Sequence, residues 1–203
     1  MATKDHQSEP IESASETLQR IFDGHGSVLG SQMADESSRY DVLKKTDFPK
    51  PQRTRRIAVA NQKGGVGKTT STVNTAAALA NKGAQVLVID MDPQGNASTA
   101  LGVSHASGEP SVYDVIEGRS DLGDVITVCP DFPTLDVVPA SIDLSGAELE
   151  VADLPNRNTL LKEALDLYLR QSDKHYDYVF IDCPPSLGLL VINAMCAVTE
   201  MLI

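Results

Sequence analysis

The feature that most constrains this chain is a glycine-rich turn between an apolar run and a helical pattern. The apolar run, Ile57 to Ala60, predicts a buried strand, and the Ala-rich stretch from Thr69 to Asn81 has apolar residues at helical spacing. Between them stands the sequence Gln-Lys-Gly-Gly-Val-Gly-Lys-Thr, residues 62–69. It fits the phosphate-binding loop pattern except that Gln62 replaces the first glycine. The turn therefore predicts a site for the phosphates of a nucleotide.

The physical chemistry of the loop explains its residue types. Gly64, Gly65 and Gly67 have no Cβ, so the backbone can curl and aim its N–H groups at phosphate, and the following helix adds its positive end. Lys68 is expected to reach the β- and γ-phosphates, and the Thr69 hydroxyl to ligate Mg²⁺. The alternative, a turn with merely solvated lysines, fits the strand–loop–helix context poorly. The residues expected to contact the nucleotide are Gln62, Lys63, Gly64, Gly65, Val66, Gly67, Lys68, Thr69 and Thr70.

Acidic residues end two further apolar runs. Asp182 follows the run 178–181, where a carboxylate would hold the water shell of Mg²⁺. Asp90 and Asp92 follow the run 86–89, and one of them is expected to position the attacking water. The alternative is that both only cap the following turn, which suits Asp90 in part and Asp92 poorly.

The whole pattern from residue 57 onward predicts an α/β fold, because strands and helices alternate. Right-handed crossovers would place helices on both faces of a mostly parallel sheet, with ligands at the carboxyl ends of the strands. We therefore expect a P-loop NTPase fold that is incomplete at the C-terminus. Further strands are expected at 135–138 and 201–203, and further helices at 112–117, 142–151, 158–171 and 186–197, the last one buried because it is apolar almost all round.

Charge divides the chain into two parts. Residues 1–56 hold nine acids and nine bases, whereas residues 57–203 hold 19 acids and eight bases. Such an acidic body is unsuited to binding DNA by simple charge attraction. Residues 1–56 are expected to be a disordered N-terminal extension, because their apolar residues are few and scattered, and residues 57–203 to be the ATPase domain.

Two segments of the extension have a distinct composition, one amphipathic and one basic. Residues 11–22 are amphipathic and are expected to form a weakly ordered, transient helix, with a partner-binding helix as the alternative. The basic cluster before the domain is expected to be a solvated linker, with an auxiliary contact to a polyanion as the alternative. Its members are Lys44, Lys45, Lys50, Arg53, Arg55 and Arg56.

The cysteines and the hydropathy pattern limit the protein class. Cys129, Cys183 and Cys196 are odd in number and form no C-x-x-C pair, so neither a disulfide framework nor a Cys-rich zinc site is expected. The longest near-apolar run, 187–198, is too short to span a bilayer, and the polar N-terminus is not a secretory signal. We expect a soluble, intracellular protein with reduced thiols.

Three motifs carry a family resemblance. N-Q-K-G-G-V-G-K-T-T at 61–70, D-M-D-P-Q-G-N at 90–96 and D-C-P-P-S-L-G at 182–188 together resemble the ParA/Soj chromosome-partitioning ATPases, a deviant Walker A group related to MinD and the nitrogenase iron protein. The resemblance implies an ATP- and Mg²⁺-dependent homodimer that binds DNA without sequence preference and hydrolyses ATP when a ParB-type partner stimulates it. It also implies a cytoplasmic, nucleoid-associated protein without a membrane contact.

The same resemblance assigns roles to individual residues. Lys63 resembles the signature lysine that crosses the dimer interface to the partner's ATP. Asp92 matches the catalytic aspartate that positions water, with Asp90 supporting the metal site from its second shell. Lys68 and Thr69 match the P-loop lysine and the Mg²⁺ ligand, and Asp182 the Walker B residue that holds Mg²⁺ through water.

The family continues well beyond Ile203. We expect the part that follows to carry the remaining strands, part of the adenine pocket and the basic DNA contacts.

Three alternatives to a ParA-type function stay open. A MinD-like membrane-positioning ATPase would need a C-terminal amphipathic helix, and D-P-Q-G-N argues against it. An Fe–S reductase would need paired cysteine ligands, for which Cys183 and Cys196 are poorly spaced. An amide-forming or carboxylating enzyme would need a small-molecule pocket.

Overall fold

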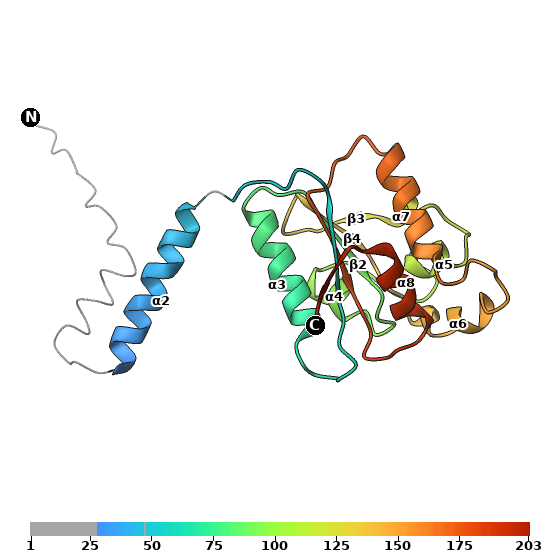
Figure 1. The fold of residues 1–203 in the computed structure, drawn as a ribbon, viewed down its shortest axis with the longest axis horizontal. Coiled ribbons are helices and arrows are strands. Elements are labelled where there is room, and N and C mark those ends of the chain that lie inside the picture. The colour runs from blue at the N-terminus through green and yellow to red at the C-terminus, as the bar shows by residue number, and fades with distance from the viewer. Residues whose placement is uncertain (1–27, 47) are drawn as a thin grey trace, which may run out of the picture. The chain divides into compact units, whose positions relative to one another are not determined.

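The computed structural model describes residues 28–46 and 48–203, and the chain divides into two units between Phe48 and Pro49 (Figure 1). The described part of the first unit contains helix α2, Val28–Lys45. This helix was not predicted from the sequence, because its apolar residues do not form a stripe at helical spacing. None of its side chains from residue 31 onward is buried. The transient helix expected at 11–22 lies outside the described residues.

The second unit is built on a six-stranded sheet in the order β3-β4-β2-β5-β1-β6. All neighbouring strands run parallel except the short edge strand β3, which is antiparallel to β4. The fold class predicted from the sequence is therefore confirmed. The strands are β1 Arg55–Val59, β2 Val86–Asp90, β3 Thr127–Val128, β4 Leu135–Val138, β5 Tyr178–Asp182 and β6 Glu200–Leu202.

Helices cover both faces of this sheet (Figure 1). Helix α3 lies on one face, and α5, α7 and α8 lie on the other. The helices of this unit are α3 Lys68–Asn81, α4 Asn96–Ala100, α5 Val112–Ile116, α6 Ala147–Glu150, α7 Leu160–Gln171 and α8 Leu189–Ala197, with 3₁₀ turns η1 Leu122–Val125 and η2 Ile142–Ser145.

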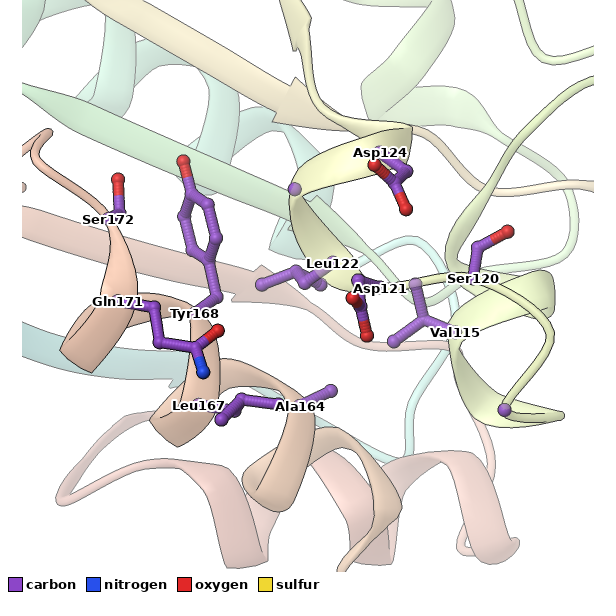
Figure 2. Close-up of a pocket in the computed structure, with 12 residues that line it drawn as sticks. Val115, Ser120, Asp121, Leu122, Asp124, Ala164, Leu167, Tyr168, Gln171 and Ser172 are labelled. Atoms are coloured by element: carbon purple, nitrogen blue, oxygen red, sulfur yellow. The ribbon is translucent and has the colours of Figure 1, made fainter.

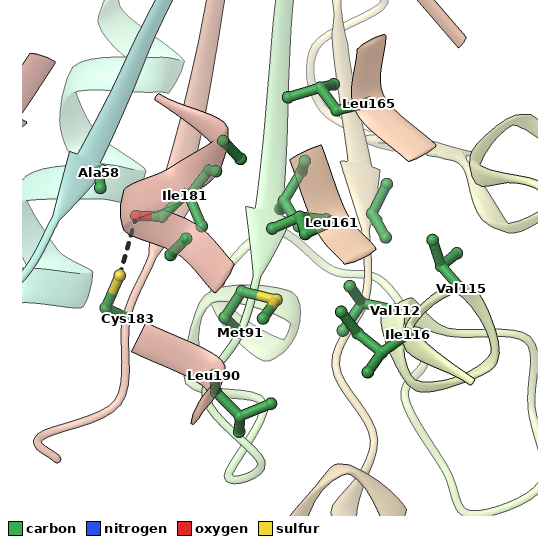
Figure 3. Close-up of a cluster of buried hydrophobic side chains, with 14 of the residues drawn as sticks. Ala58, Met91, Val112, Val115, Ile116, Leu161, Leu165, Ile181, Cys183 and Leu190 are labelled. Carbon is green, nitrogen blue, oxygen red and sulfur yellow. Dashed lines mark hydrogen bonds between the residues drawn. The ribbon is translucent and has the colours of Figure 1, made fainter. Parts of the chain in front are cut away.

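The two-residue period of the strands creates two cores. In β2, Val86 and Val88 pack with Ala76 of α3, whereas Leu87 and Ile89 belong to the opposite core. Figure 3 shows that opposite core, in which side chains from α5, α7 and α8 meet the sheet. Because both faces are covered, every residue of β2 is buried, which explains why its sequence is a continuous apolar run that ends in an aspartate.

Two helix predictions need correction. The helix expected over 142–151 is broken into η2 and α6, with Gly146 between them, because glycine is a poor helix former. The helix expected over 186–197 begins only at Leu189, after a backbone that is extended at Gly188. It is also not buried all round, since Ile192 and Met195 are 39% and 37% exposed.

Three of the basic residues before residue 57 form ion pairs with carboxylates of the second unit. Lys50 Nζ lies 3.3 Å from Asp177 Oδ2, Arg55 pairs with Glu200 in β6, and Arg56 pairs with Asp166 in α7. Three members of the predicted linker therefore already have carboxylate partners, which leaves them less available for a polyanion than the sequence suggested. The boundary predicted between residues 56 and 57 stays a prediction.

Candidate nucleotide-binding site

The site lies where the carboxyl ends of β1, β2 and β5 meet. These strands are neighbours in the sheet, and their register pairs Asp182 with both Val59 and Asp90. The three loops that follow them carry the three sequence motifs, residues 60–67, 91–95 and 183–188. The backbone N–H of Met91 donates to the carbonyl of Asp182 at 2.9 Å, so the start of the loop after β2 is joined to the end of β5. The fold therefore brings together motifs that are more than 100 residues apart.

The loop after β1 forms an open cradle. Gly65 and Gly67 have φ angles of 72° and 92°, in the left-handed region that side chains disfavour. A Cβ added to Gly64, Gly65 or Gly67 would meet no protein atom within 4 Å. Backbone conformation thus favours glycine at Gly65 and Gly67, and the loop leaves open space in front of α3. That space, facing the positive end of a helix, fits a phosphate chain.

This cradle is part of a pocket of about 510 Å³. Seven predicted site residues line it, six from the loop and helix start together with Asp92. Gln62, Lys63 and Val66 are exposed and do not line it, and Asp90 and Asp182 are fully buried. The lining residues are Gly64, Gly65, Gly67, Lys68, Thr69, Thr70, Asp92, Gln94, Asn96 and Pro185.

Asp182 is buried behind Thr69, a lining residue of the pocket, and has two hydroxyl partners from α3. Thr69 Oγ1 donates to one carboxylate oxygen at 2.7 Å, and Thr72 Oγ1 donates to the other at 3.0 Å. Burial raises the pKa of Asp182, the two hydroxyl bonds lower it, and the nearby charge of Asp92 raises it further. The Thr69 hydroxyl and the neighbouring carboxylates of Asp92 and Asp182 are hard oxygen donors of the kind that Mg²⁺ prefers, and the charge of Lys68 also lowers the pKa of Asp182. The residues present therefore fit a magnesium ion beside phosphate.

Asp90 is bound into the protein rather than facing the pocket. Its Oδ2 accepts hydrogen bonds from the N–H and the hydroxyl of Ser98, both at 2.8 Å, and its Oδ1 accepts from the N–H of Asp92 at 3.1 Å. Burial raises its pKa to about 6. The capping role weighed for Asp90 is thus visible in the structure, and any effect on a metal would be indirect.

Asp92 combines a cap with a place in the pocket. Its Oδ1 accepts a hydrogen bond from the N–H of Gln94 at 3.0 Å, and its side chain lines the pocket opposite the phosphate loop. Within residues 28–46 and 48–203, no hydrogen bond reaches its Oδ2. One carboxylate oxygen therefore anchors the side chain, while the other is available to a group in the pocket.

The two lysines of the loop differ in their surroundings. Lys68 Nζ lies 3.3 Å from the carbonyl oxygen of Lys63, so its ammonium is folded across the loop where phosphate would sit. Lys63 is exposed, and its backbone N–H donates to Asn61 Oδ1 at 2.9 Å. The side chain of Lys63 does not line the pocket of its own chain.

Some residues at the site were not singled out from the sequence. Gln94, Asn96 and Pro185 line the pocket and stand inside the second and third motifs, so their position in the motifs was the available signal. Thr72 and Ser98 contact the buried aspartates, and no local pattern marked them. Thr72 could have been found from its spacing, because it lies three residues after Thr69 and so faces the same strand.

A second pocket, of about 370 Å³, lies between α5, η1 and α7 (Figure 2). Tyr168 and Leu122 form part of its wall, and Asp121 and Asp124 stand at its edge. It contains no basic side chain and none of the site residues predicted from the sequence. It is therefore unsuited to phosphate, although its volume is comparable to that of the first pocket.

The described part of the chain has no helix with the length and apolar character that crossing a bilayer requires.

Comparison with known proteins gives a consistent result. An AAA domain family model matches residues 54–203. The chain is 50% identical to the sporulation initiation inhibitor protein Soj of Bacillus subtilis (strain 168) over 141 residues. These aligned residues make up 70% of this chain and 54% of Soj. It is 48% identical to the chromosome partitioning protein ParA of Caulobacter vibrioides (strain NA1000 / CB15N), also over 141 residues. These make up 70% of this chain and 52% of that ParA.

A solved structure is similar as well. Cobyrinic acid a,c-diamide synthase from Mycobacterium smegmatis, with bound ATP analog and magnesium, matches with a TM-score of 0.66 at 40% identity, over 73% of this chain and 57% of that chain. The chain spans about half the length of the curated relatives it matches. Because the family model covers most of the chain and the three motifs meet at one site, the chain belongs to the AAA domain family, and its resemblance to the ParA/Soj ATPases is confirmed.

Proposed function

We propose that the chain contains the ATP-binding and ATP-hydrolysing site of a ParA-type partitioning protein, with residues 57–203 as the ATPase domain. One observation carries the proposal. The glycine cradle, Lys68 and Thr69 line a single pocket at the carboxyl ends of three adjacent strands, and the Thr69 hydroxyl is bonded to the buried carboxylate of Asp182 behind it. Open space, an ammonium group and hard oxygen ligands in that arrangement suit a nucleoside triphosphate with its magnesium ion.

Each residue would have a distinct task. The N–H groups of the loop and Lys68 would hold the phosphate chain, and Thr69 would hold the metal, with Asp182 acting through a metal-bound water. Mg²⁺ would offset the charge of the phosphates and of the nearby carboxylates. The open carboxylate oxygen of Asp92 would orient water toward the terminal phosphate. Asp90 would support this arrangement from behind.

We also propose a cycle in which the protein dimerises with ATP, binds DNA and is released after hydrolysis. Lys63 is exposed beside the pocket rather than inside it, which suits a contact with the phosphates of a nucleotide held by a second copy of the chain. The homodimer formed with ATP would bind DNA without sequence preference, through residues beyond Ile203. A ParB-type partner would stimulate hydrolysis and so release the protein from the nucleoid in the cytoplasm.

A second candidate is an amide-forming enzyme, which the similarity to the diamide synthase favours. Such an enzyme would turn over ATP only with a carboxylic acid substrate and a nitrogen donor. The Fe–S alternative gains no support from Cys183, whose thiol is fully buried and whose pKa burial raises to about 12. A thiol in that environment resists the deprotonation that metal ligation needs.

The test measures nucleotide affinity and phosphate release separately. We expect the protein to bind ATP with Mg²⁺, and Lys68→Ala to lose that binding because the charge-assisted contacts to phosphate are removed. Lys82→Ala, at the end of the same helix, is the matched control and should bind normally. Phosphate release that rises with duplex DNA supports the partitioning role, whereas release that depends on added glutamine and a carboxylic acid supports the synthetase. Unchanged ATP affinity in Lys68→Ala would refute the phosphate-loop assignment itself.

A further inference from the structure

Ser98, in the short helix α4, has no solvent exposure and does not line the nucleotide pocket. It nevertheless makes three hydrogen bonds with two separate segments, the end of β2 and the residues after β4. Its N–H and its hydroxyl both donate to Asp90 Oδ2 at 2.8 Å, and its Oγ accepts the N–H of Ala140 at 3.1 Å. Ala140 follows β4, whereas Asp90 ends β2. Ser98 therefore joins the carboxyl ends of two neighbouring strands.

The chain of hydrogen bonds continues from Asp90 to the pocket. Asp90 Oδ1 accepts the N–H of Asp92 at 3.1 Å, which fixes the backbone from which the Asp92 side chain enters the pocket. The carbonyl of Asp92 in turn accepts the N–H of Gly95 at 2.9 Å and closes the turn. The contacts therefore run without a gap from Ala140 through Ser98 and Asp90 to Asp92.

Asp90 depends on Ser98 for its orientation. The Asp90 carboxylate is fully buried, and two of the three hydrogen bonds it accepts come from Ser98. Loss of the Ser98 hydroxyl leaves Oδ2 with one donor, the N–H of residue 98, and a partly unsatisfied carboxylate in the interior is drawn toward another partner because such a group is costly to bury. If the carboxylate of Asp90 turns, the N–H of Asp92 loses its anchor. A shift of this kind at a water-positioning group slows the chemical step, since reactivity is sensitive to displacements on the order of 1 Å.

We propose that Ser98 is a positioning residue for ATP hydrolysis, which holds Asp92 in place through the side chain of Asp90. The inference rests on the proposed role of Asp92. It assigns to Ser98 no contact with nucleotide or metal. Ser98 should accordingly affect the rate of the chemical step and leave nucleotide affinity unchanged.

The test is Ser98→Ala in the intact protein, with ATP and Mg²⁺. The affinity for ADP and for a non-hydrolysable ATP analogue should stay within about twofold, because the phosphate loop is untouched. The kcat should fall about tenfold with KM unchanged, a change in activation free energy similar to the net value of one buried hydrogen bond.

Ser111→Ala is the matched control. Ser111 is equally buried, at 1% exposure, and its hydroxyl also faces a carboxylate, that of Asp114 at 3.3 Å. It caps α5 rather than contacting the Asp90 loop. This variant should lose thermal stability to a similar extent as Ser98→Ala and keep its kcat.

Ser98→Cys is the second variant, which fills the site but is a weak donor. Should Ser98→Ala fail to fold, Ser98→Cys is expected to show a severalfold lower kcat with normal nucleotide affinity. Full kcat in either folded Ser98 variant, or an equal loss in Ser111→Ala, would overturn the inference. Failure of the wild-type protein to hydrolyse ATP would instead overturn the proposed function, so the two results are distinguishable.

Discussion

Thr69 Oγ1 and Asp182 Oδ2 are 2.7 Å apart, and this hydrogen bond joins the first turn of α3 to the end of β5. The bond places the two oxygens that the proposed metal site requires next to each other. Asp182 also accepts the Thr72 hydroxyl, so its carboxylate has a fixed orientation. A metal ion would therefore meet a preorganised pair rather than two independent side chains.

Thr69→Val should separate the contribution of the metal to ATP affinity from the contribution of the phosphate contacts. Valine has a similar shape but no oxygen ligand, so affinity for ATP with Mg²⁺ should fall at least about tenfold, the loss of one good ligand. Affinity measured with EDTA in place of Mg²⁺ should stay close to that of the wild type. A titration in both buffers checks this, and an equal loss in both would mean that Thr69 acts through folding of the loop.

Asp92→Ala should bind ATP and fail to hydrolyse it. Binding depends on the loop and the metal, whereas Asp92 is proposed to act only on water in the chemical step. The variant should therefore accumulate as an ATP-bound dimer, which light scattering would detect. Asp131→Ala, an exposed aspartate between β3 and β4, is the control and should behave as wild type. Normal phosphate release by Asp92→Ala would remove Asp92 from the mechanism.

Lys63→Ala should bind ATP but stay monomeric. The side chain is exposed and lies outside the pocket of its own chain, so its proposed contact exists only across the interface. Nucleotide titration and sedimentation with ATP measure the two properties independently. An ATP-dependent dimer of undiminished affinity would show that Lys63 is only a residue of the loop.

Asp90 gives a prediction for pH. Burial raises its folded pKa from 3.8 to about 6, so the folded state binds more protons than the unfolded state between these values. Its contribution to stability is full below pH 3.8 and is lost as the pH rises through 6. In the nucleotide-free protein the free energy of unfolding should therefore fall by about 3 kcal/mol across this window, relative to Asp90→Asn.

Urea unfolding at a series of pH values would measure that difference. Asparagine cannot titrate, so the comparison isolates Asp90 from the other carboxylates. Asp121→Asn removes one exposed carboxylate and controls for the change in net charge. Parallel pH profiles for the wild type and Asp90→Asn would show that Asp90 has the same pKa in the folded and unfolded states.

The sequence predicted the parts of the fold whose patterns are local. Leu135–Val138 and the run ending in Asp182 were recognised at their observed bounds because strands buried on both faces are continuous apolar runs. The two-residue strand β3 and the five-residue helix α4 were missed, since neither is long enough for a period to appear.

The site residues also divide into those that local patterns reveal and those that they do not. The phosphate loop and Asp92 could be found from motifs, because their residue types follow from the chemistry of phosphate. Ser98 could not, because its importance arises from a contact with Asp90 eight residues earlier and with Ala140 forty-two residues later. Only the folded backbone brings those groups together.

The pairing of Asp90 with Asp182 across β2 and β5 has a consequence for how such a site tolerates change. Both carboxylates project to the α3 side of the sheet because Val88 and Phe180, two residues earlier, already point into that core. A slip of one residue in either strand would send its aspartate to the opposite face. The apolar interior thus determines which face of the sheet these two carboxylates occupy, and variants that loosen it should be recovered in screens for lost turnover as readily as variants of Asp90 and Asp182 themselves.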